Sequence, residues 1–241
     1  MKPTMTFRKR GFTLLETVIA IGVLSVLLTG FIVVFTPAAQ GIKKSINLQQ
    51  ADRLASTLEQ ELVTLRTAAD TTSFGTGFGK AFDWIKNSNV ATSALLAYQY
   101  RGDPSKLRDD NTATPVESLQ GKLPGKDYVV VSMLRRKSDS NLSADLAAVE
   151  GPVYVVKCTQ LKFSGGNLIL DPLIAGTIVD PKTGDTVASA TAYPEAVIAY
   201  AADFYQLPSS SASFVAGTAF SSAFNGFVKN PVFTRNFAVG R

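Results

Sequence analysis

Residues 8–35 of the 241-residue chain read RKRGFTLLETVIAIGVLSVLLTGFIVVF: three basic residues and a glycine, then an apolar run whose one charge is Glu16. A helix from Phe12 to Phe35 spans roughly 36 Å at about 1.5 Å per residue, enough to cross the hydrocarbon core of a membrane. The basic residues in front of this run predict that the N-terminus stays cytoplasmic and that the residues after Phe35 are exported. The sequence therefore predicts a single membrane span at the start of the chain.

The composition restricts the chemistry that is open to the chain. Without histidine there is no Ser-His-Asp triad, no Cys-His pair and no imidazole-bound zinc or haem. The single cysteine, Cys158, allows neither an intramolecular disulfide nor an all-thiolate zinc site. We therefore expect no catalytic, cofactor-binding or metal-binding residue. An enzyme would have to be a carboxylate-based hydrolase, with two acids facing each other in a cleft.

The net charge of +5 is located at the N-terminus. Lys2, Arg8, Lys9 and Arg10 lie within the first ten residues without an acid among them, and the rest of the chain is nearly neutral. A nucleic-acid binder carries its basic residues as a patch or stripe on the folded domain. We expect no nucleic-acid partner, and the pattern is typical of a membrane-targeting segment.

Two common kinds of apolar N-terminal segment fit this run poorly. A secretory signal peptide has an apolar region of only about 7 to 15 residues before its cleavage site. Residues 36–39, TPAA, resemble such a site, but the run before them is too long. A plain transmembrane anchor fits the length but not Glu16, because an acid near the helix centre costs about 2.5 to 3.5 kcal/mol on insertion.

A third interpretation accounts for the acid. Residues 8–16, RKRGFTLLE, resemble the class III signal of type IV prepilins and of the pseudopilins of type II secretion systems. In that family a membrane peptidase cuts after the glycine and methylates the new terminus, so the resemblance implies cleavage between Gly11 and Phe12 and an N-methylated Phe12. It also implies three partners: prepilin peptidase, sister pilins or pseudopilins, and an assembly platform in the cytoplasmic membrane.

Glu16 is the candidate assembly residue. A carboxylate inside an apolar helix bundle is tolerated when it pairs with a cation at the same depth, and the amine of a neighbouring subunit's Phe12 is such a cation. A pair of this kind would set the axial register while apolar packing supplies adhesion. The alternative is a glutamate that extends to the membrane surface and has no assembly role.

The resemblance implies an α+β, pilin-like fold, in which one long N-terminal helix packs on an antiparallel β-sheet head. Pro37 and Gly41 are expected to interrupt and kink the helix. Beyond them, Ala51, Leu54, Ala55, Leu58, Leu62 and Leu65 form a narrow apolar stripe, whereas the charged residues, Glu61 and Arg66 among them, mostly occupy other faces. The expected layout is a leader (1–11), a transmembrane and assembly helix (12–36), an amphipathic helix (37–69) and a globular head (70–241).

Within the head, residues 70–126 are the least regular part. Residues 71–79 are expected to form a loop, 81–85 and 93–100 short helical pieces, and 101–104 and 109–111 turns. The later residues are rich in β-branched and aromatic side chains. They predict strands at 128–134, 153–163, 167–170, 177–180, 186–190, 197–207 and 232–239, with hairpin turns at 164–166 and 180–185.

Three smaller features give weak functional signals. Residues 75–80, GTGFGK, lack the spacing and the hydroxyl residue of a phosphate-binding loop. Asp180 and Asp185 supply far fewer oxygens than the 6 to 8 that calcium takes, so a solvated turn is favoured. Cys158 is expected to be a small buried apolar residue rather than an intermolecular bridge or reactive thiol.

Function is then expected to depend on the N-terminal helix. The resemblance implies a subunit that waits in the cytoplasmic membrane and is extracted into a periplasmic or extracellular filament. Residues 12–241 make a chain that is large beside typical major pilins, which favours an accessory subunit, a minor pilin or pseudopilin. The alternative is an adhesive or ligand-binding head on the same anchor. Six phenylalanines near the C-terminus test that alternative: Phe214, Phe220, Phe224, Phe227, Phe233 and Phe237. If they form an exposed aromatic patch, they support an adhesive head, and if they lie in the core, they do not.

Overall fold

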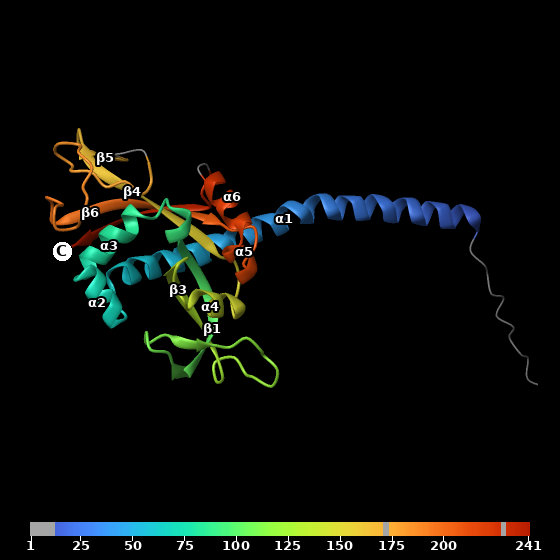
Figure 1. Cartoon of the computed structure of the whole chain (residues 1–241). Coiled ribbons are helices and arrows are strands. Elements are labelled where there is room, and N and C mark those ends of the chain that lie inside the picture. The colour runs from blue at the N-terminus through green and yellow to red at the C-terminus, as the bar shows by residue number, and fades with distance from the viewer. Residues whose placement is uncertain (1–12, 171–173, 228–229) are drawn as a thin grey trace, which may run out of the picture. The chain divides into compact units, whose positions relative to one another are not determined.

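The computed structural model describes residues 13–170, 174–227 and 230–241 (Figure 1). The chain forms two compact units that divide between Ile46 and Asn47. The described residues of the first unit form the N-terminal part of one long helix, and the second unit contains the rest of that helix together with the head.

Helix α1 runs without a break from Leu14 to Val63. The predicted interruption at Pro37 and Gly41 is therefore wrong, although the prediction of one long helix is confirmed. Pro37 lacks the N–H that would reach the carbonyl of Val33, but the turns on either side keep their hydrogen bonds, and these continue the helix across the proline.

The head contains a sheet of seven strands, and every pairing in it is antiparallel. The main path is β2-β1-β4-β6-β7, while β3 pairs with β1 and β5 pairs with β4. With α1, this sheet confirms the predicted α+β fold. The strands are β1 (Leu95–Leu107), β2 (Ala113–Pro115), β3 (Val129–Arg136), β4 (Tyr154–Ser164), β5 (Asn167–Leu170), β6 (Val197–Gln206) and β7 (Phe233–Gly240).

Helices cover both faces of the sheet, so the centre of the head has three layers. One core lies between the sheet and the last turns of α1 with α3; the other lies between the sheet and the short helices α4 to α6. Leu95 faces the first core and Leu96 the second, because successive strand residues point to opposite faces. The short helices are α2 (Ala68–Phe74), α3 (Gly77–Lys86), a 3-10 turn η1 (Ala91–Ser93), α4 (Leu142–Ala147), α5 (Ala212–Ala216) and α6 (Thr218–Gly226).

Strand β1 differs most from the structure that the sequence predicts. Residues 93–100 were expected to be helical, but Leu95 to Tyr100 begin a strand that continues through the expected turn at 101–104 to Leu107. This strand pairs with β3 along 95–102 and with β4 along 95–97. Both of its faces are buried near its start, so it lacks the alternation of a half-buried strand, and a short apolar run of this kind does not distinguish a strand from a helix.

Two other expected elements are also wrong. Residues 71–79 are mostly helical, in α2 and the start of α3, where Thr67 and Asp70 form a reciprocal cap at the start of α2. Residues 177–180 and 186–190 form no strand, and a single bridge joins Val179 to Thr186. The turn between them is present, since the N–H of Gly184 donates to the carbonyl of Asp180 at 2.8 Å.

Candidate functional site

The first turn of α1 is closed by a pair of side chains. The N–H of Thr13 donates to Glu16 Oε2 at 3.2 Å, and the N–H of Glu16 donates to Thr13 Oγ1 at the same distance. This reciprocal pair is a capping box, which satisfies two of the amides that a helix leaves open at its start. The Glu16 carboxylate therefore already has a partner within its own helix.

The next turns of α1 contain little else that is polar. Within Leu14–Ile42, the most apolar window of 18 residues has a mean hydropathy of 2.8, and none of this window is buried. The hydroxyls of Ser25, Thr29 and Thr36 each donate at 2.8 Å to the carbonyl one turn earlier. Because these hydroxyls are satisfied inside the helix, they add little cost in a lipid environment, and Glu16 remains the one charged side chain of this segment.

The last turns of α1 belong to the head. Leu54, Leu58 and Leu62 are fully buried in the first core, which confirms this part of the predicted apolar stripe. Leu65, which was predicted to continue the stripe, lies beyond the end of α1 at Val63. Glu61 is buried too, although the sequence placed it on a polar face. Its carboxylate is held by the guanidinium of Arg66, whose Nε donates at 2.7 Å, and this pairing raises the pKa of Arg66.

Residues 6–32 match the prokaryotic N-terminal methylation motif. The matched stretch contains the basic end of the leader, Gly11, Glu16 and the first turns of the exposed apolar helix. The chain carries a class III prepilin signal. No curated protein and no solved structure matches the chain.

This prepilin signal marks the chain as type IV pilin-like or pseudopilin-like. Such a signal implies processing by a prepilin peptidase and assembly with other pilins. The motif belongs to structural subunits and not to a family of enzymes. With the apolar helix that follows it, the signal fits anchoring in a membrane before assembly. Gly11 and Phe12, the predicted processing residues, lie outside the residues that the structure describes.

Outside the signal, the pilin-like head contains a buried ionic network. Asp145 is fully buried and accepts hydrogen bonds from Tyr98 Oη at 2.6 Å and Arg135 Nε at 2.7 Å, and Arg108 Nη2 lies 2.7 Å from its other oxygen. Burial and the neighbouring Asp145 charge raise the pKa of Tyr98 well above its ordinary value. The network links β1, β3 and α4.

Asp110 belongs to the same network. The sequence placed it in a turn, and the turn is present, with Asn111 at a φ of 58°, but the Asp110 side chain is buried. Burial alone would raise its pKa. Hydrogen bonds from Thr112 and Arg135 outweigh that effect and hold the pKa well below the usual range. Asp110 and Asp145 are thus joined through Arg135, whose guanidinium lies 2.7 Å from both carboxylates.

The weaker signals in the sequence fall on structural positions. Lys80, from the glycine-rich run, is buried and donates to the carbonyl of Thr64 at 2.5 Å, while its amine lies 4.4 Å from the Trp84 ring centroid. Asp180 accepts the backbone N–H of Lys182 within the exposed turn. Cys158 is a free, fully buried thiol, as expected, and burial raises its pKa. Within the described residues, no group of three or more acidic or cysteine side chains is arranged to hold a metal.

The C-terminal phenylalanines do not form an exposed patch. Phe220 and Phe224 are buried in the second core, and Phe214 and Phe227 pack against it partly buried. Phe233 and Phe237 pack partly buried against the first core. These six side chains therefore belong to the two cores or pack against them, as the core interpretation predicts and as the adhesive alternative does not.

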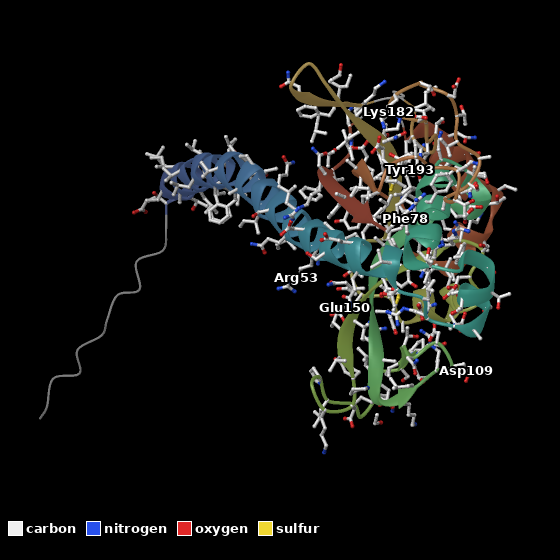
Figure 2. All side chains as sticks on the ribbon, turned by 90° about the vertical axis from the view of Figure 1, so that its left-hand side faces the viewer. Arg53, Phe78, Asp109, Glu150, Lys182 and Tyr193 are labelled. Atoms are coloured by element: carbon white, nitrogen blue, oxygen red, sulfur yellow. The ribbon has the colours of Figure 1, made fainter. Side chains whose placement is uncertain are left out.

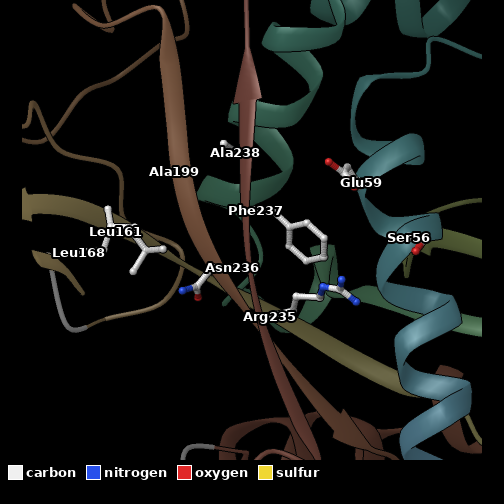
Figure 3. A pocket seen from close by; sticks show the side chains of 9 residues that line it. All are labelled: Ser56, Glu59, Leu161, Leu168, Ala199, Arg235, Asn236, Phe237 and Ala238. Atoms are coloured by element: carbon white, nitrogen blue, oxygen red, sulfur yellow. The ribbon is translucent and has the colours of Figure 1, made fainter.

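An open hollow of about 500 Å³ lies beside the last turns of α1 (Figure 3). Ser56 and Glu59 on α1 form one side, and Phe237 on β7 lies opposite them. Leu161 and Leu168, from the hairpin of β4 and β5, close the far end.

Sequence reasoning missed two features of this chain. Thr13 was not identified, although the spacing Thr-x-x-Glu before an apolar run is the sequence signal of a capping box. The Arg135 network had no such signal, because its members are separated by up to 47 residues and meet only when the sheet forms.

Proposed function

We propose that the chain is an accessory structural subunit, a minor pilin or pseudopilin, of a type IV pilus or type II secretion filament. The observation that carries this proposal is the match of residues 6–32 to the methylation motif, which overlaps a helix whose apolar side chains are exposed from Leu14 to Ile42 (Figure 2). A helix that is apolar on all sides needs lipid or other helices around it. Membrane and filament would supply these in turn.

Processing comes first in this proposal. The prepilin peptidase cuts between Gly11 and Phe12, and the mature chain begins with a methylated Phe12. The N-terminus faces the cytoplasm and the head is exported. Terminal sequencing and intact mass of the protein from its native host test this step; a chain that starts at Ala39, or that retains Met1, contradicts it.

Assembly follows through Glu16, whose carboxylate pairs with the Phe12 amine of a neighbouring subunit. Because the carboxylate also caps its own helix, two variants separate the roles. Glu16→Gln keeps a side chain that is suited to the capping box but removes the charge. Thr13→Ala removes the capping partner and keeps the charge.

Under the pairing mechanism, the amount of the Glu16→Gln variant in the sheared filament fraction falls sharply, since loss of one side of a buried ion pair costs about 3 to 5 kcal/mol. Thr13→Ala is incorporated nearly as well as wild type. The measurement compares the sheared fraction with the membrane pool for each variant. Equal incorporation of Glu16→Gln and wild type, or equal loss in both variants, contradicts the pairing role.

A further inference from the structure

Strand β7 lies at one edge of the sheet. It pairs with β6 along its whole length without a register shift, and no other described strand pairs with it. Just beyond β7, the N–H of Arg241 donates to the carbonyl of Ala196 at 3.0 Å, which sets the phase of the hydrogen bonds between the two strands. Bonded and non-bonded pairs alternate in an antiparallel ladder, so every second residue of β7, Asn236 and Ala238 among them, directs its N–H and C=O away from β6.

The other strands that pair on one side only are shorter or better covered. β2 has three residues and ends at Pro115, and β5 has four. β3 has eight residues, as β7 has, but Val130 is its one exposed residue, whereas five residues of β7 are exposed. Natural sheets protect long edges with prolines, bulges or charges, because an open edge is a template for another strand. β7 contains no proline, and its one charged residue, Arg235, is ion-paired with Asp52 on α1.

The hollow of Figure 3 runs along this free edge. Four consecutive residues of β7, 235–238, line it. Successive residues of a strand point to opposite faces of the sheet, so a hollow that all four line lies at the edge of the strand. Figure 3 shows β7 between two flanks, with Ser56 and Glu59 of α1 on one side and Leu161 and Leu168 on the other.

The two flanks differ in their chemistry. Leu161 and Leu168 make one flank apolar, and Leu168 is 54% exposed. On the other flank the Glu59 carboxylate is exposed, and Arg235, the one cation among the described residues that line the hollow, is already paired with Asp52. A strand added to β7 would place alternate side chains on the two flanks, so apolar residues suit the first and basic residues the second.

We propose that β7 binds an extended segment of a sister pilin-like subunit as an added strand of the sheet. Hydrogen bonds to the main chain of β7 supply the affinity, and alternating apolar and basic side chains in the segment supply the specificity. This step rests on the proposed function, which places the chain among sister subunits. One free edge takes one strand, so each copy joins one neighbour of another kind, as suits an accessory subunit.

Photo-cross-linking of the full chain in its native host tests the contact. A benzophenone amino acid replaces Asn236 in one variant and Ala238 in another. We expect each to give an adduct with the same sister subunit in the sheared filament fraction. The two attachment points should lie in one segment of that subunit and be shifted by two residues, because paired strands advance with the same spacing. The matched control carries the same amino acid at Val90, an exposed apolar residue that does not line the hollow, and should give no adduct with that segment.

Two substitutions at Ala238 test the backbone bond itself. Ala238→Pro removes an N–H that points away from β6, whereas Ala238→Ser keeps it. The adduct formed from position 236 should be about fivefold weaker with Ala238→Pro than with Ala238→Ser, which is the effect of one lost hydrogen bond. Both variants should unfold at the same denaturant midpoint in detergent, as followed by Trp84 fluorescence. A much lower midpoint for Ala238→Pro would contradict the outward direction of this N–H.

Four results would overturn the added strand while the proposed function stands. These are adducts between two copies of this chain, adducts with a protein that is not pilin-like, attachment points scattered over several segments, and filaments that contain the chain without an adduct. Absence of the wild-type chain from filaments would contradict the proposed function, and the added strand with it.

Discussion

Leu27 and Leu58 lie in the same helix and have opposite surroundings. Leu27 belongs to a segment whose apolar side chains are exposed on every side, and Leu58 lies in a narrow stripe that is fully buried against the sheet. The first pattern requires an apolar solvent or a bundle of helices, whereas the second is satisfied by one protein surface. A single continuous helix therefore joins a part whose apolar side chains are exposed to a part whose apolar stripe is buried against the sheet.

Deletion of the covered part of α1, which contains Leu54, Leu58 and Leu62, should have the largest effect on the folding of the head. A fragment that starts at Gln40 retains the buried stripe and should be monomeric, with one cooperative unfolding transition. A fragment that starts at Asp70 loses Leu54, Leu58 and Leu62 and exposes the sheet face that they cover, so it should aggregate. Size-exclusion chromatography and denaturant unfolding distinguish the two; equal stability would mean that the stripe contributes nothing to the core.

The same substitution in the two parts of α1 gives the next largest difference. Leu58→Ala should lower the free energy of unfolding of the head by about 2 to 5 kcal/mol, because it leaves a cavity in the first core. Leu27→Ala should change it by less than about 0.5 kcal/mol. The single tryptophan, Trp84, lies in that core and reports unfolding by its fluorescence in the full chain in detergent. Similar losses in both variants would contradict a division of α1 into covered and uncovered parts.

A smaller effect than that of Leu58→Ala is expected from acid, which should destabilise the head by protonating the Asp110 carboxylate of the ionic network. The pKa of Asp110 is depressed in the folded state, so the unfolded state takes up its proton first as the pH falls. The stabilisation is complete above about pH 5 and is lost as the pH drops through the ordinary Asp range and below it. Asp110→Asn should cost about 1.5 to 3 kcal/mol at neutral pH and show a shallower decline in acid. Parallel pH profiles for wild type and Asp110→Asn would contradict this.

Features that depend only on residues close together in the chain could be predicted from the sequence. The apolar span, the basic residues before it and the Leu54, Leu58 and Leu62 stripe need only composition and helical spacing. The strands β3 to β7, rich in β-branched and aromatic residues, could be located for the same reason, although the strands predicted at 177–180 and 186–190 do not form. The assembly residue Glu16 is conspicuous because a charge in an apolar run is costly wherever the helix packs.

Only the tertiary structure decided the features that depend on distant segments. Leu95 to Tyr100 became a strand because β3 and β4 supply its hydrogen-bond partners and because cores form on both of its faces. Asp110 and Asp145 are buried together because Arg135 lies between them. The hairpin of β4 and β5 has the sequence pattern of any other strand pair, yet Phe163, Leu168 and Leu170 on it are exposed. Burial depends on which surfaces meet, and a local pattern does not contain that information.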